Sequence, residues 1–252
     1  MPLTAQQHET YRRKGYVTLR GLFAPDEVTN WAAESARLLA LGIANKDNLR
    51  THPHYITENC WIVDRYDPVI DISDVFRKLA SDSRIRDVMA QILGDDVFLF
   101  KDRLIYKMLG MPGYPIHQDY SWWQEFPEDL VNVAIAIDGA DAENGALELF
   151  PGYRHLLSAP GEMRHMNEAE AQQIELGEGE LMTTQPGDVV IFGCMTPHRS
   201  GPNLSNRTRR QFYVTYSAAR HGDLYNRQLE LFKEGRSSKR LSAEQKARAF
   251  FR

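Results

Sequence analysis

Two histidines and one aspartate are the residues of this sequence best suited to hold a metal ion. His117 and Asp119 lie two positions apart in Ile116-His117-Gln118-Asp119-Tyr120, and His198 follows much later in the chain. On a β-strand, residues two apart project from the same face of the sheet. Two imidazoles and one carboxylate can occupy one face of an octahedral metal and leave three positions open. That ligand set is typical of non-haem iron(II) oxygenases.

The composition favours an ordinary soluble globular protein. The chain has 252 residues, of which 42% are hydrophobic and 25% charged, and its formal net charge is −4. This balance, with no long basic run, argues against nucleic-acid binding. No run of eighteen apolar residues predicts a membrane span, and the first residues lack the features of a signal peptide. The two cysteines, Cys60 and Cys194, form neither a disulfide framework nor a zinc motif, so we expect a cytoplasmic protein.

The first part of the chain reads as helices that would support the metal-bearing part. Thr4 and Gln7 form a capping box that predicts a helix to about residue 13, and Pro25 opens a second helix. Two more helices are predicted at about 72–80 and 83–93, the second ending at Gly94. Residues 41–70 read as irregular, with a possible strand at 61–63. That segment is either a loop over the site or a surface connection.

From about residue 97 the pattern changes to strands separated by turns. Strands are predicted at 97–107, 131–138, 146–150, 189–192 and 210–216, and Asn144-Gly145 marks a turn. Helices followed by many strands indicate a mainly β jelly roll with a helical buttress. We expect a single domain over 1–252, with a helical part at about 1–95 and a jelly-roll core at about 96–220. A helical tail, capped by Ser242 and Gln245, would follow.

Four motifs, in order, resemble the phytanoyl-CoA dioxygenase family. They are His117-Gln118-Asp119, Asn144-Gly145-Ala146-Leu147, Pro151-Gly152-Tyr153-Arg154-His155, and His198-Arg199-Ser200-Gly201-Pro202-Asn203 with Arg209. The likeness extends from about residue 8 to 220. It implies an oxygenase dependent on Fe(II) and 2-oxoglutarate, built on a double-stranded β-helix, the cupin-like jelly roll.

The resemblance implies which groups occupy the coordination positions of the metal. His117, Asp119 and His198 would hold Fe(II), 2-oxoglutarate would take two open positions, and O2 the third. The products would be succinate, CO2 and a hydroxylated substrate, with ascorbate a useful reductant in vitro. Relatives that halogenate replace the carboxylate with a small residue, so the presence of Asp119 favours hydroxylation.

A cation is expected to bind the distal carboxylate of 2-oxoglutarate. Arg209 follows His198 at the family's spacing, and strand alternation sends Arg210 to the opposite face, so we favour Arg209. Ser200 resembles the family's hydroxyl donor to the same carboxylate. Two further candidates for cosubstrate contacts are Lys101 and Asn132. Where some relatives carry Asn this chain has Ile105, which leaves the partners of the other cosubstrate oxygens open.

Three aromatic residues close to the metal motif are candidates for binding substrate. Tyr120, Trp122 and Trp123 could wall the substrate pocket, or they could simply pack the mouth of the barrel. A relative that hydroxylates a small zwitterion has an aromatic residue at the position that matches Trp123. Further possible polar anchors are Tyr114, Lys107 and Arg220. We expect a structural role for His155 and solvated positions for His52, His54, His165 and His221.

The sequence therefore predicts a hydroxylase of an unactivated C–H bond in a small polar molecule. Amino acids, amines, compatible solutes and aminophosphonates all fit, and an acyl-CoA fits less well because no basic patch is evident. One alternative is desaturation, epimerisation or cyclisation by the same chemistry in secondary metabolism. Others are a cupin-like metal-dependent isomerase or hydrolase and a non-catalytic binding protein. The partner would be a small molecule, and the protein a monomer or homodimer.

Overall fold

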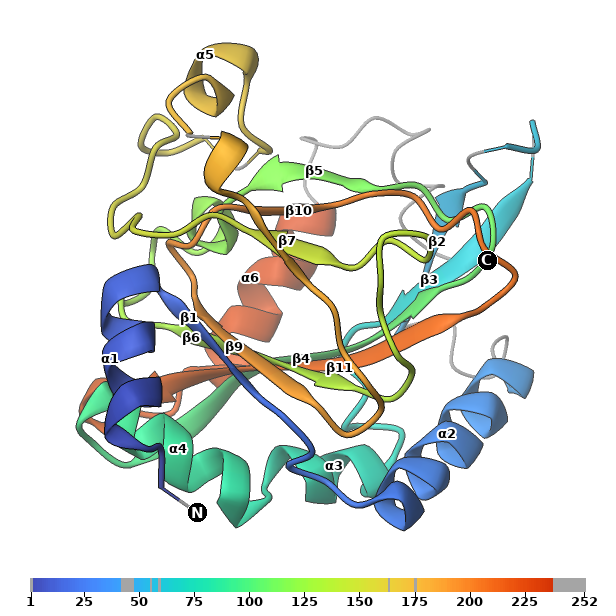
Figure 1. Cartoon of the computed structure of the whole chain (residues 1–252), viewed down its shortest axis with the longest axis horizontal. Helices are drawn as coiled ribbons and strands as arrows, with labels where there is room; N and C mark the ends of the chain where they lie inside the picture. The colour runs from blue at the N-terminus through green and yellow to red at the C-terminus, as the bar shows by residue number, and fades with distance from the viewer. Residues whose placement is uncertain are drawn as a thin grey trace.

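Two antiparallel sheets face each other in the computed structural model, which describes residues 2–41, 48–54, 56–58, 60–162, 164–174 and 176–237 (Figure 1). The larger sheet has the order β1-β9-β6-β11-β4-β3-β2 and the smaller β5-β10-β7-β8. The larger contains β1 (Tyr16–Leu19), β2 (Leu49–Pro53), β3 (Trp61–Tyr66), β4 (Val97–Lys107), β6 (Val131–Ala136), β9 (Val189–Gly193) and β11 (Arg209–Ala218). The smaller contains β5 (Tyr114–His117), β7 (Leu147–Leu149), β8 (Glu180–Met182) and β10 (His198–Ser200). The predicted jelly roll, a double-stranded β-helix, is confirmed.

The predicted N-terminal helices form the buttress of the large sheet. They are α1 (Ala5–Lys14), α2 (Pro25–Ala40), α3 (Asp74–Ala80) and α4 (Ser83–Leu93), and α2 to α4 lie along the side of the large sheet that faces away from the small one (Figure 1). Thr4 and Gln7 form the expected capping box, and Gly94 ends α4 in the left-handed conformation. None of the described helices is long and apolar enough to cross a membrane.

Strand β11 shows how the large sheet divides its side chains between two environments. Phe212 and Val214 join the apolar cluster under the helices, whereas Tyr213 joins the cluster between the sheets. The same alternation places Arg209 inside the barrel and Arg210 on the helical side. There Arg210 forms an ion pair with Asp138 at 2.8 Å and donates to the carbonyl of Ala32 in α2.

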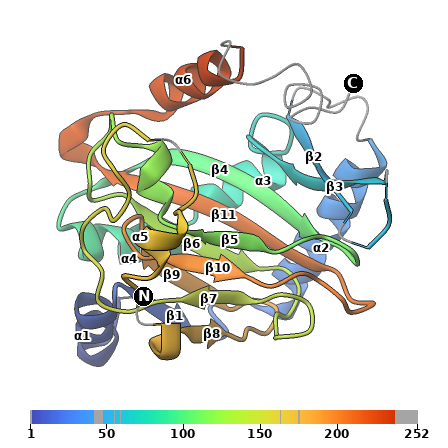
Figure 2. The ribbon, with the colours of Figure 1, turned by 90° about the horizontal axis from the view of Figure 1, so that it is seen from above.

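Two segments differ from the sequence-based prediction. Residues 41–70 were expected to be irregular apart from a possible strand at 61–63. That strand is confirmed within β3, and β2 pairs with it in a hairpin that joins the large sheet through the pairing of Arg65 with Ile105. The polar composition of β2 hid this strand from the sequence-based prediction, because cross-strand pairing supplies what its apolar pattern lacks. Helix α6 (Tyr225–Ser237) was not predicted, and it packs on β4 (Figure 2). The helix expected after Ser242 lies outside the described residues.

Candidate active site

The three predicted metal ligands meet at one end of the barrel. His117, at the end of β5, lies directly opposite His198 at the start of β10 in the antiparallel pairing. Asp119 opens a short 3₁₀ helix (Asp119–Trp122), so the expectation that it shares a strand with His117 is wrong. The turn nevertheless brings its carboxylate inward, and one ligand atom from each residue lies within 4.8 Å of the others. The Asp119 carboxylate oxygens lie 3.8 Å from His117 Nε2 and 4.0 Å from His198 Nε2.

Backbone carbonyls orient both imidazoles for metal binding. Nδ1 of His117 lies 2.7 Å from the carbonyl oxygen of Pro115, and Nδ1 of His198 lies 3.0 Å from that of Thr196. A carbonyl only accepts, so each Nδ1 carries the proton and each Nε2 presents its lone pair to the centre. The two rings are 4.1 Å apart between centroids.

The electrostatics keep the ligands in the protonation states that a metal requires. Burial lowers the pKa of both histidines, and the charge of His198 lowers that of His117 further. Burial alone would raise the pKa of Asp119, but Arg103, His198 and His117 outweigh it and bring the pKa to about 2. Two neutral imidazoles and one carboxylate are therefore available to a divalent cation.

Asn132 and Arg103 hold the carboxylate of Asp119. Asn132 Nδ2 donates to Asp119 Oδ2 at 3.0 Å, and Arg103 Nη2 donates to the same oxygen at 3.2 Å. Thr215 Oγ1 in turn donates to Asn132 Oδ1 at 2.7 Å. Asn132 was expected to contact the cosubstrate, whereas here its amide is used to orient a metal ligand. Arg103 was not among the predicted residues, although its place on the inward face of β4 could have marked it.

A second polar cluster lies behind the triad, where the cosubstrate was expected. Arg209 is 1% exposed, and its Nε and Nη1 have no hydrogen-bond partner among the described residues. Ser200 Oγ accepts from Lys107 Nζ at 2.7 Å. Burial and the charge of Arg209 lower the pKa of Lys107 to about 6. Buried donors of this kind fit a carboxylate ligand, because an unpaired buried guanidinium is costly.

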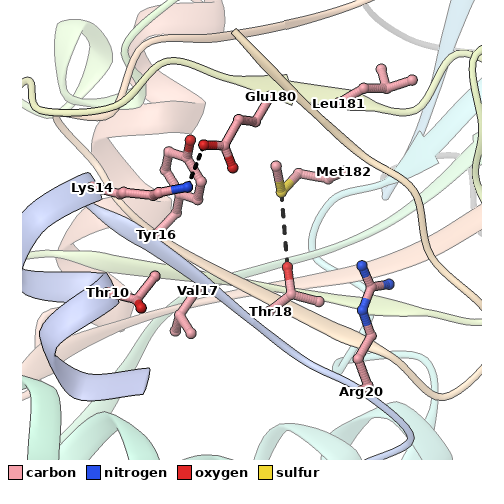
Figure 3. A pocket seen from close by; sticks show the side chains of 9 residues that line it. All are labelled: Thr10, Lys14, Tyr16, Val17, Thr18, Arg20, Glu180, Leu181 and Met182. Carbon is pink, nitrogen blue, oxygen red and sulfur yellow. Dashed lines mark hydrogen bonds and ion pairs between the residues drawn. The ribbon is translucent and has the colours of Figure 1, made fainter. Parts of the chain in front are cut away.

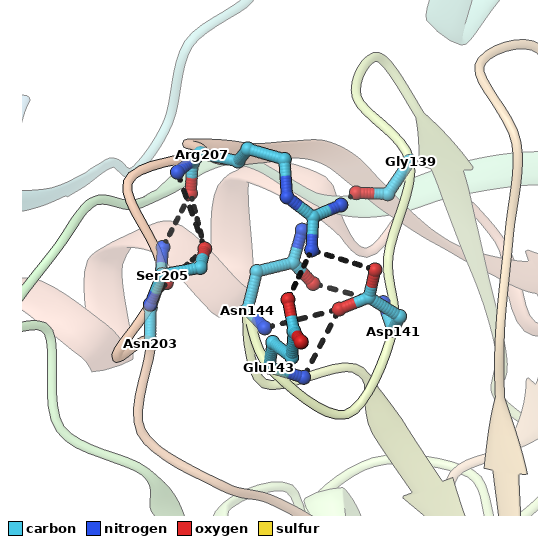
Figure 4. A network of polar contacts seen from close by, with 7 residues as sticks. All are labelled: Gly139, Asp141, Glu143, Asn144, Asn203, Ser205 and Arg207. Atoms are coloured by element: carbon cyan, nitrogen blue, oxygen red, sulfur yellow. Dashed lines mark hydrogen bonds and ion pairs between the residues drawn. The ribbon is translucent and has the colours of Figure 1, made fainter.

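The family motifs around this cluster form its scaffold. Asn203 Nδ2 donates to the carbonyl of Lys107 at 2.6 Å, which ties the turn before β11 to β4. Asn144 donates to the carbonyl of Gly139 in a network that Arg207 joins through Asp141 (Figure 4). This network braces the turn that contains Gly145.

Gly145 shows why that turn needs glycine. It has a φ of +73°, and a Cβ there would lie 2.4 Å from the carbonyl oxygen of Gly201 and 2.9 Å from Lys107 Nζ. The close approach of this backbone to Lys107 therefore depends on the absence of a side chain.

The three aromatic candidates occupy two different environments. Tyr120 and Trp123 are buried in an apolar cluster with Phe100, and the Tyr120 hydroxyl donates to a backbone carbonyl. Trp122 packs edge-on against His117 at 5.4 Å, and His165 lies at the same distance from that ring. Trp122 therefore lies beside the triad, whereas Trp123 belongs to the apolar cluster. His165 is exposed, as expected, and its ring lies beside those of His117 and Trp122.

The remaining predicted anchors have partners of their own. Lys101 Nζ forms a buried ion pair with Asp67 at 2.8 Å, and the Tyr114 hydroxyl donates to Asp64. Arg220 forms ion pairs with Asp95 and Asp129, and all three side chains are partly exposed. Ile105 is buried between the sheets. A separate groove between the edges of β1 and β8, lined by residues such as Lys14 and Glu180, contains no triad residue (Figure 3).

Comparison with known proteins agrees with this site. The family model of phytanoyl-CoA dioxygenase matches residues 11–211. The chain belongs to the phytanoyl-CoA dioxygenase family. Methylphosphonate hydroxylase from Gimesia maris is 28% identical over 230 residues, which are 88% of this chain and 84% of the relative. Ectoine dioxygenase from Sphingopyxis alaskensis is 26% identical over 245 residues, or 86% of this chain and 76% of that one.

A solved structure extends the likeness to three dimensions. The crystal structure of EctD from S. alaskensis with bound Fe matches with a TM-score of 0.76 at 26% identity. The match covers 87% of this chain and 78% of that one. The protein is thus a dioxygenase of this family, and its residues fit both the iron and the 2-oxoglutarate that its sequence predicts.

Proposed function

We propose that the protein hydroxylates an unactivated C–H bond of a small polar molecule, using Fe(II), 2-oxoglutarate and O2. The observation that carries this proposal is the pairing of two sites in one barrel. The triad of His117, Asp119 and His198 can hold the metal. The guanidinium of Arg209 is buried, and two of its nitrogens have no partner among the described residues, so it can bind an anion. A metal with three open positions and a nearby carboxylate site is what a chelating keto acid needs.

The side chains of the protein bind and orient the reactants. Bound Fe(II) with 2-oxoglutarate and O2 supplies the oxidising chemistry, which releases succinate and CO2. Arg209 and Ser200 would hold the distal carboxylate, the guanidinium in the bidentate geometry that it favours. Asn132 and Arg103 keep the Asp119 carboxylate turned toward the metal. Trp122, packed on His117, would shield that side of the centre from water.

The names of the relatives support a small polar substrate. They include a methylphosphonate hydroxylase, an ectoine dioxygenase and a 2-aminoethylphosphonate dioxygenase. We propose the same substrate class here, bound near Trp122. Tyr120 and Trp123 would then act indirectly, by packing the turn that positions Asp119 and Trp122.

Succinate production tests the proposal. The protein, supplied with Fe(II), 2-oxoglutarate, ascorbate and O2, should release succinate, and a productive small molecule should accelerate the release. His198→Ala should abolish it, because the metal loses one of its two imidazole ligands. His221→Ala, which alters a surface histidine paired with Asp129, is the matched control and should keep full activity. Product formation under strict anaerobiosis would instead support the isomerase or hydrolase alternative. The Nε and Nη1 atoms of Arg209, which have no hydrogen-bond partner among the described residues, count against that alternative.

We further propose a cytoplasmic enzyme with one oxygenase domain and no nucleic-acid or membrane partner. The two cysteines are unpaired in the structure, as a reducing compartment would leave them. The net charge of −4 supports the absence of a nucleic-acid partner. Size-exclusion chromatography with light scattering would distinguish the monomer from the homodimer.

A further inference from the structure

The 3₁₀ helix at Asp119–Trp122 presents a different group of side chains on each of its three faces. Such a helix has three residues per turn, so side chains at i and i+3 share a face. Asp119 and Trp122 face the metal centre, where the first is a ligand and the second packs on His117. Tyr120 and Trp123 join the apolar cluster. The third face continues beyond both ends of the helix as a polar row that consists of Gln118, Ser121 and Gln124.

Gln118 is bonded to the beginning of segment 155–162, which forms no helix or strand. Its Nε2 donates to the carbonyl oxygen of His155 at 2.7 Å, and its Oε1 accepts from the backbone N–H of Leu157 at 2.8 Å. The same buried amide donates to the carbonyl oxygen of Met195 at 2.6 Å. Backbone groups away from water need hydrogen-bond partners, and here a side-chain amide replaces the neighbouring strand that the segment lacks.

Ser121 and Gln124 extend this contact along the segment. Ser121 Oγ lies 3.1 Å from Ser158 Oγ, and both side chains are buried. Gln124 Oε1 accepts from the backbone N–H of Gly161 at 2.6 Å, and Gln124 Nε2 donates to the carbonyl oxygen of Glu162 at 3.2 Å. The polar row is therefore hydrogen-bonded to the segment at its beginning, middle and end.

His165 follows this segment in the chain, and its ring packs against the most exposed of the three metal ligands. The side chain of His117 is 12% exposed, whereas those of Asp119 and His198 are 5% and 7% exposed. The His165 ring lies 5.4 Å from that of His117 at 88° and 5.1 Å from that of Trp122 at 75°. These are the edge-to-face arrangements that aromatic rings prefer. His165 and Trp122 therefore stand side by side on the solvent side of His117.

We propose that the polar row positions His165, and that His165 and Trp122 together form a wall on the solvent side of the metal centre. The wall keeps bulk water from the metal and limits the size of the substrate that can bind beside it. This inference rests on the proposed function, because it assigns the wall to the iron centre of that reaction. The members of the polar row act through His165 and are positioning residues.

Amide hydrogen exchange, followed by NMR, tests whether the polar row holds the segment. Gln124→Ala removes the acceptor of the Gly161 N–H. Exchange of that N–H should accelerate by roughly 2- to 10-fold, the range expected for the loss of one neutral hydrogen bond. The N–H of Leu157, which donates to Gln118, is the internal control, and its exchange should not change.

Mn(II) bound at the triad tests the wall without substrate or turnover. This paramagnetic ion relaxes the protons of water that reaches it, so the relaxation rate of bulk water measures access to the metal. His165→Ala should raise the relaxivity of the Mn(II)-loaded protein and leave the Kd of Mn(II) unchanged, because His165 is not a ligand. Gln124→Ala should also raise the relaxivity, and the double variant should equal His165→Ala, because both changes act through one side chain. His165→Phe should restore the wild-type relaxivity, because it returns a ring to the wall.

His155→Ala is the matched control. This exposed histidine belongs to the same segment and bonds to Gln118 through its backbone carbonyl, which the substitution keeps, so the relaxivity should not change. The proposal is wrong if His155→Ala acts like His165→Ala, or if exchange of the Gly161 N–H does not respond to Gln124→Ala.

The relaxivity of the His165 variants gives the decisive outcomes. The proposal is overturned if His165→Ala leaves the relaxivity unchanged or weakens Mn(II) binding, if His165→Phe does not restore the relaxivity, or if the double variant exceeds His165→Ala. Failure of the wild type to bind Mn(II) would overturn it too. Succinate release by the wild type tests the proposed function separately from all of these outcomes.

Discussion

Replacement of Arg209 by methionine should have opposite effects on the stability of the unliganded protein and on its response to 2-oxoglutarate. Arg209 is 1% exposed, and two of its nitrogens lack partners among the described residues. The unliganded fold therefore carries a buried cation with unmet hydrogen bonds. Methionine has a similar length and no charge, so Arg209→Met removes that cost while filling most of the space.

The expected magnitudes follow from these contacts. Replacing a poorly compensated buried charge by an apolar side chain raises the free energy of unfolding by about 1–4 kcal/mol. For a chain of this size, about 1 kcal/mol moves the Tm by roughly 2–4 °C, so the unliganded variant should melt several degrees higher. In the wild type, 2-oxoglutarate at about 100 times its Kd adds roughly 2.7 kcal/mol. Loss of a desolvated charge contact costs about 2–5 kcal/mol of binding energy, which would remove most of that gain.

Thermal unfolding with and without 2-oxoglutarate, under anaerobic Fe(II), measures both effects. Arg210→Met is the matched control because Arg210 faces the helices and forms two hydrogen bonds to Asp138 at 2.8 Å. That variant should melt lower than the wild type and keep its full response to 2-oxoglutarate. If Arg209→Met lowers the Tm and retains the response, or if Arg210→Met loses it, the assignment of the two faces of β11 is refuted.

Three further predictions concern other parts of the structure. Asn132→Ala should weaken Fe(II) binding by roughly 10- to 100-fold in an anaerobic metal titration, because Asp119 loses an orienting donor; unchanged affinity would contradict this. Gly145→Ala should lower both the Tm and the affinity for 2-oxoglutarate, since the added carbon meets Gly201 and Lys107; wild-type values would count against it. Burial raises the pKa of Asp102 to about 6, so its ionisation disfavours the fold, and stability should fall as the pH rises from about 4 to 6. Asp102→Asn should remove this fall in the free energy of unfolding, measured by urea titration at each pH. If the variant keeps the same dependence on pH, the ionisation of Asp102 is not its cause.

The pattern of residue types predicted much of the site because the chemistry limits the choice. His117, Asp119 and His198 could be selected from the sequence because their spacing and the motifs around them resemble one family in the expected order. Strand alternation correctly separated Arg209 from Arg210, because the period of a strand leaves no third possibility. Helix caps such as that of Thr4 were also predictable, as they depend on contacts within one turn.

The tertiary structure decided which polar groups meet across the barrel. The pairing of Asn132 with Asp119, the contact of Arg103 with the same carboxylate and the position of His165 join residues from separate elements. The β2–β3 hairpin likewise depends on its pairing with β4 more than on its own apolar pattern. Local propensity and residue spacing can be determined from the sequence, and they predict the types of the metal ligands and the positions of most strands. Contacts between distant elements depend on side-chain packing between the two sheets, and only the folded barrel determines which of them form.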